Sequence, residues 1–130
     1  MTTVLLDTHV LHWWAVEPER VAPSAARALE QADELAVAAI SWWELAWLAT
    51  HGRVIIAVPV ATWLGRLARE VRTVVLSPSI AAAAAALPAT FPRDPADRLI
   101  YATAVEHGWR LVTKDQHLRA HDEAGAVTIW

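Results

Sequence analysis

Five carboxylic acids stand where the sequence passes from one predicted element to the next: Asp7, Glu44, Asp94, Asp97 and Asp115. Asp7 and Asp115 each follow a short apolar run predicted as a strand, whereas Glu44, Asp94 and Asp97 lie in the first turns of predicted helices. In open parallel sheets, functional groups gather outside the carboxyl ends of the strands. The sequence therefore predicts a carboxylate cluster assembled from four separate segments of the chain.

A cluster of this kind needs a counter-charge. Two carboxylates about 5 Å apart repel by roughly 3 kcal/mol at an effective dielectric constant of about 20, so protons or a cation must balance the charge. The chain contains no cysteine, and oxygen ligands favour Mg²⁺ or Mn²⁺. A metal held by carboxylates and waters keeps positions open for a phosphate oxygen and an attacking water, which suits phosphodiester hydrolysis.

Helix capping is the alternative explanation for each acid taken singly. Asp94, followed by a proline, is typical of a helix N-cap, and Asp97 lies where an acid favours the helix dipole. The sequence SWWE fits a capping box, in which Glu44 bonds back to the backbone of Ser41. The two acids that follow strands would each cap a following helix. Capping explains the acids one by one, but it explains their convergence on one edge less well.

The elements that would position these acids alternate between strands and helices along the 130 residues. Short apolar runs predict strands at residues 4–6, 35–40, 73–76, 110–113 and 127–129. Helical patterns are predicted at residues 9–16, 23–32, 41–51 and 61–69, from residue 78, and at 94–107. This alternation predicts one α/β domain over residues 1–130, with three α/β/α layers around a parallel sheet.

Four stretches of the chain resemble a known family: LLDTHVLHWW, SWWELAWL, DPADRLIYATAVEHGWRLVTKD and the final VTIW. Their order and spacing are similar to those of PIN-domain ribonucleases, in particular the VapC-type toxins of type II toxin–antitoxin systems. The resemblance covers nearly the whole chain. It implies a PIN-like sheet of five parallel strands between helices, a negatively charged pocket, a cognate antitoxin that covers this pocket, and a homodimer.

The resemblance also implies a role for each acid. Asp7, Glu44, Asp97 and Asp115 match the family's first, second, third and fourth acids in turn. Asp7 and Asp97 would be the most direct Mg²⁺ ligands, with Glu44 and Asp115 completing the catalytic site or holding metal-bound waters; Mn²⁺ would be an acceptable substitute. A metal-activated water would attack the RNA phosphate in line and leave 5′-phosphate and 3′-hydroxyl ends.

Residues beside these acids also match the family, with two departures. Thr8 and Thr113 match positions where the family commonly carries Ser or Thr, and their hydroxyls would support the acids from a second shell. His9 replaces the usual Ser or Asn, and the DPADR segment adds a second acid. The matching sequence DRLIYATA favours Asp97 as the metal ligand, which leaves Asp94 as a cap or an outer-shell group.

Basic side chains flank the acidic segments: Arg93, Arg98, Lys114 and Arg119. They would hold RNA phosphates beside the negative pocket, or else form ion pairs with neighbouring acids. Among the histidines, His9 and His12 are three residues apart, but oxygen ligands suit this chemistry better. We expect His107, His117 and His121 to be surface or capping residues.

Eight tryptophans are unusual for a chain of this length. Most are expected to be core anchors. Trp43 and Trp47 are four residues apart on one predicted helix, and Trp13 and Trp14 end another. The alternative is that some of the tryptophans lie at a homodimer or antitoxin interface, where tryptophan is enriched.

The formal charge of −3 excludes a protein that is held to nucleic acid by its net charge alone. No signal peptide or membrane span is predicted, and we expect a cytoplasmic protein. The predicted function is a Mg²⁺-dependent endoribonuclease toxin whose RNA substrate, with tRNA among the candidates, is not identified by the sequence. The alternatives are a catalytically silent PIN-like interaction module and, less favoured, a receiver-like phosphoacceptor domain.

Overall fold

A parallel sheet forms the centre of the molecule. In the computed structural model, which describes residues 1–122 and 124–130, the sheet has the strand order β3-β2-β1-β4-β5. Every neighbouring pair is parallel. The strands are β1 (Thr3–Leu6), β2 (Glu34–Ala38), β3 (Arg72–Val74), β4 (Arg110–Val112) and β5 (Thr128–Ile129). The predicted five-stranded parallel sheet is confirmed, although β2, β3 and β4 end one or two residues before their predicted ends.

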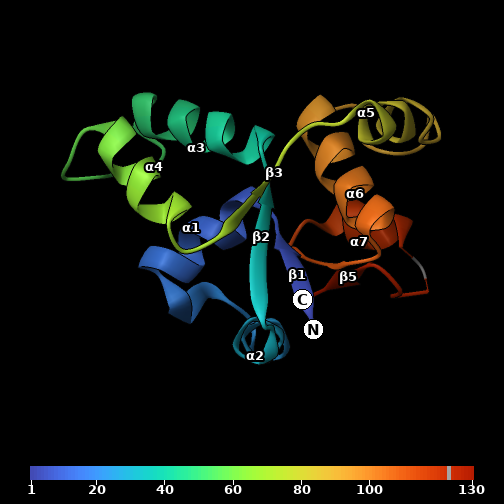
Figure 1. Ribbon diagram of the computed structural model, residues 1–130, viewed down its shortest axis with the longest axis horizontal. Helices are drawn as coiled ribbons and strands as arrows, with labels where there is room; N and C mark the ends of the chain where they lie inside the picture. The colour runs from blue at the N-terminus through green and yellow to red at the C-terminus, as the bar shows by residue number, and fades with distance from the viewer. Residues whose placement is uncertain (123) are drawn as a thin grey trace.

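Helices cover both faces of the sheet, as Figure 1 shows. They are α1 (Thr8–Val16), α2 (Pro23–Gln31), α3 (Ile40–Thr50), α4 (Val60–Ala68), α5 (Pro78–Ala85), α6 (Pro95–His107) and α7 (Gln116–His121), with a short 3₁₀ turn η1 (Pro18–Arg20). Of these, only η1 and α7 have no counterpart among the predicted ranges. Helix α6 ends as its sequence predicts, at Gly108, which has a positive φ of 68°.

The strands feed two hydrophobic cores because their side chains alternate between the faces of the sheet. Val4 and Leu6 of β1 pack into one core with residues of α1, α2, α3 and α4. Leu5, between them, packs into the other core with residues of α5, α6 and α7. All four residues of β1 are buried. A buried central strand therefore fixes where the chain emerges at the carboxyl edge of the sheet.

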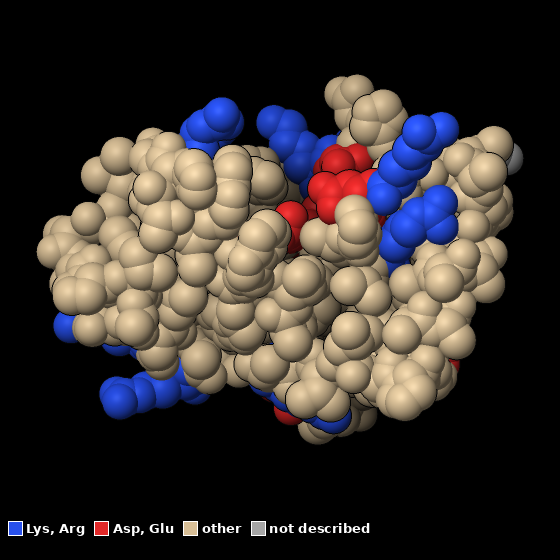
Figure 2. Space-filling view, turned by 90° about the horizontal axis from the view of Figure 1, so that it is seen from above, with Lys and Arg blue, Asp and Glu red and all other residues tan. Residues whose placement is uncertain are grey.

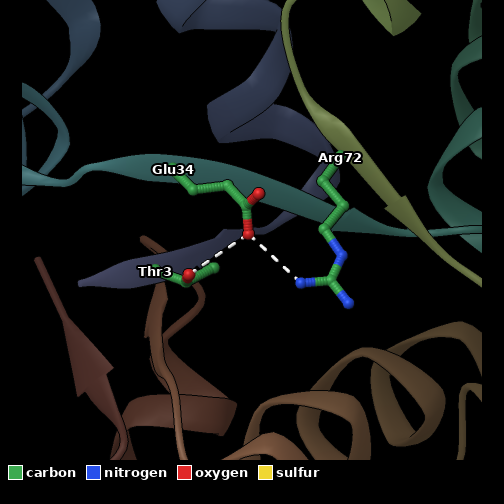
Figure 3. A network of polar contacts seen from close by, with 3 residues as sticks. All are labelled: Thr3, Glu34 and Arg72. Atoms are coloured by element: carbon green, nitrogen blue, oxygen red, sulfur yellow. Dashed lines mark hydrogen bonds and ion pairs between the residues drawn. The ribbon is translucent and has the colours of Figure 1, made fainter. Parts of the chain in front are cut away.

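A polar network joins the opposite edge, at the starts of three strands (Figure 3). Glu34 Oε1 accepts hydrogen bonds of 3.2 Å from Thr3 Oγ1 and from Arg72 Nη1. The Arg72 guanidinium also lies 5.4 Å from the centroid of the Trp109 ring. These contacts align the starts of β1, β2 and β3. Glu34 is therefore a structural acid at the amino-terminal edge of the sheet, opposite the edge where the carboxylate cluster is predicted.

No helix among residues 1–122 and 124–130 combines the length and apolar character needed to cross a membrane.

Candidate functional site

The five predicted acids line one cavity at the carboxyl edge of the sheet. The cavity has a volume of about 420 Å³, and its walls include Asp7, Glu44, Asp94, Asp97 and Asp115. Figure 2 shows acidic side chains gathered in one hollow, with basic side chains beside it. The fold thus brings together acids that lie as many as 108 positions apart in the sequence.

Asp7 is the most deeply buried of these acids, with 8% of its surface exposed. Its Oδ1 accepts a hydrogen bond of 2.8 Å from the backbone N–H of Thr8, and its Oδ2 accepts one of 2.6 Å from Thr113 Oγ1. The same Thr113 hydroxyl accepts a bond of 3.0 Å from the N–H of Asp115. Burial raises the pKa of Asp7, although the hydrogen bonds from Thr113 and Thr8 act against this rise. The Thr113 hydroxyl therefore links the ends of β1 and β4 and orients the carboxylate between them.

Glu44 is held by a different threonine. Thr8 Oγ1 donates a bond of 2.5 Å to Glu44 Oε1, and the Thr8 and Ser41 hydroxyls lie 3.0 Å apart. Burial raises the pKa of Glu44, with the Thr8 hydrogen bond opposing it and the charge of Asp7 adding to it. The two threonine hydroxyls thus each fix one carboxylate of the cavity.

The predicted capping box at residues 41–44 is wrong. Helix α3 begins at Ile40 and its N-cap is Ala39, which has no side-chain capping bond. Ser41 is therefore inside the helix and fully buried, and Glu44 lies beyond the first turn. The bond from Thr8 to Glu44, across 36 positions of sequence, replaces the local bond that the sequence suggested.

Asp94 and Asp115 cap helices and line the cavity at the same time. Asp94 Oδ1 accepts a bond of 2.9 Å from the N–H of Ala96 at the start of α6. Asp115 Oδ1 accepts bonds of 2.8 Å and 3.1 Å from the N–H groups of His117 and Leu118 at the start of α7. Each cap uses one carboxylate oxygen, and within the described part of the chain no hydrogen bond to the other oxygen is formed. Capping and cluster formation are therefore compatible.

Asp97 shows how crowded the negative charge is. Its pKa is raised to about 7, first by burial and then by repulsion from Asp94, Asp7, Asp115 and Glu44, in that order. A carboxyl group with this pKa retains a proton near neutral pH unless a cation takes its place. The four surrounding acids make the cavity a place where positive charge is strongly favoured.

A hard divalent cation fits this donor set. All the acids offer oxygen ligands, which Mg²⁺ and Mn²⁺ prefer, and the raised pKa of Asp97 reflects an unmet need for positive charge. Among residues 1–122 and 124–130, no three Asp, Glu or His side chains are already arranged around one point as the ligands of an ion. Mg²⁺ commonly keeps several waters when it is bound by one or two carboxylates.

The four predicted RNA-binding cations occupy different environments. Lys114 lines the acidic cavity, and its Nζ lies 5.7 Å from the centroid of the Trp13 ring. Arg93 and Arg119 are exposed, the first beside Asp94 and the second on α7.

The structure corrects the prediction that Arg98 binds RNA phosphates. Its guanidinium donates to five backbone carbonyls between 2.9 and 3.4 Å, those of Ala84, Leu87, Pro88, Phe91 and Pro92. A guanidinium whose nitrogens are all engaged by the protein backbone is not available to phosphates. Arg98 therefore holds the segment that leads into α6.

Sequence reasoning did not assign four further side chains that line the acidic cavity: His9, Val10, Trp13 and Gln116. Proximity to Asp7 was the available signal for His9, and to Asp115 for Gln116. Trp13 lies six positions beyond Asp7 and four beyond His9 on α1, and the centroids of the His9 and Trp13 rings are 5.9 Å apart.

The tryptophans divide between core and surface. Trp13 and Trp63 are buried in the core. Trp43 and Trp47 are 61% and 40% exposed, and both border a hollow that shares His9 and Glu44 with the acidic cavity. An apolar, aromatic surface therefore continues from the acids along α3.

Comparisons with known proteins agree with this architecture. Residues 4–124 match the PIN domain family. The chain is 64% identical to Ribonuclease VapC22 of Mycobacterium tuberculosis over the full length of both proteins. Its fold is similar to chains in VapBC2 from Rickettsia felis bound to a promoter DNA fragment (TM-score 0.70, 15% identity, 98% of each chain) and in VapBC-5 from Mycobacterium tuberculosis (TM-score 0.64, 21% identity, 99% of this chain and 98% of that one).

The raised pKa of Asp97 predicts how stability depends on pH in metal-free protein. Between the ordinary pKa of 3.8 and about 7, folded Asp97 keeps a proton that the unfolded chain releases. Its stabilising contribution is therefore complete below pH 3.8 and is lost as the pH rises through about 7. In EDTA, we expect the unfolding midpoint to fall over this range in the wild type and to fall less in Asp97→Asn.

The matched control is Glu70→Gln, which removes the charge of an exposed acid outside the cavity and should keep the wild-type slope. Added Mg²⁺ should raise the wild-type midpoint most above pH 7, where the proton no longer competes. Identical slopes for the wild type and Asp97→Asn would show that Asp97 is not crowded as described.

The structural role of Arg98 predicts a stability effect. Arg98→Ala leaves partly buried carbonyl groups without donors, and each such group costs about 1–3 kcal/mol. We expect the free energy of unfolding in urea to fall by at least about 2 kcal/mol, whereas exposed Arg93→Ala should change it by less than about 0.5 kcal/mol. Equal stability of the two variants would remove Arg98 from this role.

Proposed function

The chain belongs to the PIN-domain family, with full-length similarity to a VapC ribonuclease, and we propose that it is a Mg²⁺-dependent endoribonuclease toxin of a type II toxin–antitoxin system. One observation carries the proposal: acids from four separate segments line a single cavity, in which burial and repulsion between the acids raise the pKa of Asp97 to about 7. The domain would comprise residues 1–130.

The residues of the cavity have separate roles. Asp7 and Asp97 would hold Mg²⁺ directly, and Glu44 and Asp115 would complete its surroundings. When bound, Mg²⁺ would supply positive charge beside the RNA phosphate and would lower the pKa of a water that it coordinates. Two threonines orient these acids. The Thr113 hydroxyl donates to Asp7 and the Thr8 hydroxyl donates to Glu44, which fixes both carboxylates before substrate binds. Mn²⁺ would substitute, since it accepts the same oxygen ligands.

Protein partners are proposed for the exposed apolar surface. Trp43 and Trp47 border a hollow that shares His9 and Glu44 with the acidic cavity, which supports a cognate antitoxin that covers the site. A hollow of about 280 Å³ beside β3, lined by apolar groups such as Val74 and Leu76, supports a homodimer contact. Tryptophan and leucine surfaces of this kind are typical of protein interfaces. We further propose that the protein acts in the cytoplasm and that tRNA is among its substrates.

Cleavage of RNA by the purified protein tests the proposal. Incubated with total tRNA and ribosomal RNA, the wild type should cut in Mg²⁺ or Mn²⁺ and should stop cutting in EDTA. Asp7→Asn should reduce the rate by at least about a hundredfold, because it removes a direct ligand and one negative charge from the cavity. Sequencing the fragment ends identifies the cut and the substrate.

Two outcomes would contradict this proposal. Cleavage that persists in Asp7→Asn would mean a contaminant or a different site. Metal binding without cleavage of any RNA would favour a catalytically silent interaction module instead.

The exposed cations predict a salt-dependent effect on RNA binding. Charge reversal of Arg93 and Lys114 leaves two phosphates beside the cavity without a cation, so affinity should fall. The slope of log Kd against log salt should become shallower by about 1 for each phosphate that is no longer neutralised. Fluorescence anisotropy with single-stranded RNA in EDTA measures both quantities. A slope equal to that of the wild type would take both residues out of the RNA path.

A further inference from the structure

A second cavity lies beside the acidic one and plays no part in the chemistry described above. It has a volume of about 500 Å³ and is lined by Thr90, Pro92, His117, Ala120 and His121. We call it the histidine cavity. Its size falls within the range of small-molecule sites, and its described lining contains no acid, which sets it apart from its neighbour.

The histidine cavity is built on a short helix with a fixed start. Asp115 caps α7, and His117 and His121 are four residues apart, so both imidazoles lie on the same face of the helix. The sequence-based expectation of separate surface histidines missed this pair, although the spacing of four is visible in the sequence. The pair is therefore a feature of the cavity, not two unrelated surface groups.

Aromatic contacts orient one member of the pair. The His121 ring meets Phe91 edge-on at 4.8 Å and Tyr101 edge-on at 5.4 Å, measured between ring centroids. Phe91 is only 1% exposed and lies beneath the Arg98 guanidinium, 5.7 Å from it. His117, by contrast, is exposed at the rim. The cavity thus combines a fixed imidazole, an exposed imidazole and the Thr90 hydroxyl.

The two cavities share a ridge. Pro92 lines the histidine cavity and Asp94 lines the acidic one, so exposed Arg93 stands between them. On α7, Gln116 lines the acidic cavity and His117 lines the histidine cavity. The two cavities therefore have lining residues on either side of Arg93 and at consecutive positions of α7.

We propose that the histidine cavity holds the base of the nucleotide next to the scissile phosphate, with the intervening RNA backbone crossing at Arg93. This inference rests on the proposed ribonuclease function and adds a specificity site to it. Single-stranded RNA is recognised by stacking bases on aromatic side chains, including histidine, and by hydrogen bonds to their edges. The imidazoles and Thr90 provide both kinds of contact, and the absence of acid from the described lining favours an RNA strand.

A transition-metal site is the competing use of two histidines at this spacing. Structural metal sites commonly need four protein ligands, whereas the described lining of the histidine cavity offers only the two imidazoles and the Thr90 hydroxyl as side-chain donors. The chain contains no cysteine. The described residues therefore favour a base over a metal ion.

Variants that remove the ring nitrogens test the proposal in the full-length protein. His117→Ala removes the exposed imidazole, and His121→Phe keeps an aromatic ring against Phe91 and Tyr101. The matched control is His107→Ala, an exposed histidine stacked on Trp109 at 4.2 Å and outside both cavities. Each variant is assayed for metal-dependent cleavage of tRNA and for anisotropy binding, in EDTA, of labelled ten-nucleotide oligomers of A, C and U.

We expect the double variant His117→Ala/His121→Phe to raise KM about tenfold, with kcat within about threefold of the wild type, and to lose the preference among the three oligomers. His117→Ala alone, which cannot disturb the core, should show part of the same effect. His107→Ala should behave as wild type.

Three results would overturn the inference. The first is a double variant that cleaves RNA with the KM and the base preference of the wild type. This result would reject the base site but would not affect the proposed ribonuclease function. The second is Ni²⁺ or Zn²⁺ binding that the double variant loses while RNA binding is unchanged, which would assign a metal site. The third is the absence of any RNA binding by wild type. Loss of cleavage in Asp7→Asn with preserved base preference would instead separate the two sites and support both.

Discussion

Negative charge is crowded at the carboxyl edge of the sheet, and the surrounding fold is arranged to tolerate it. Burial, followed by repulsion from four other acids, raises the pKa of Asp97 to about 7, and Asp7 is almost fully buried. Like charges at this density are unfavourable in a folded protein unless protons or cations balance them. The fold withstands this repulsion because burial of β1 between two cores fixes Asp7 in place, and the Thr113 and Thr8 hydroxyls stabilise the carboxylates that the fold brings together.

Helix capping and the proposed metal binding use the same residues. Asp94 and Asp115 each satisfy backbone N–H groups at a helix start with one oxygen while lining the cavity. The helix N-termini carry partial positive charge, which lowers the cost of placing acids there. A parallel sheet supplies this arrangement by geometry, since each strand ends where the next helix begins. The acids that stabilise the elements are thus already positioned for chemistry.

Positive charge is divided between structure and surface around the same edge. Arg98 donates to five backbone carbonyls before α6 and so holds the segment that carries Pro92, which lines the histidine cavity, and Phe91, which contacts His121. Arg93 and Lys114 remain exposed beside the acids. An overall charge of −3 is therefore compatible with the proposed RNA partner, because the cations that would contact its phosphates lie next to the proposed path of the strand.

The order of strands and helices, the parallel sheet and the positions of the five acids could all be predicted from the amino-acid sequence, because apolar periodicity and turn residues act over a few neighbouring positions. So could the placement of Thr8 and Thr113 beside acids. The partner that each polar group takes, by contrast, depends on the folded chain. Glu44 bonds to Thr8 instead of closing a local capping box, and Arg98 bonds to backbone carbonyls instead of remaining free. Thr8 lies 36 positions from Glu44, and the carbonyls that Arg98 binds lie 6 to 14 positions away. Local sequence patterns act over shorter separations, so only folding decides which of the competing groups meet.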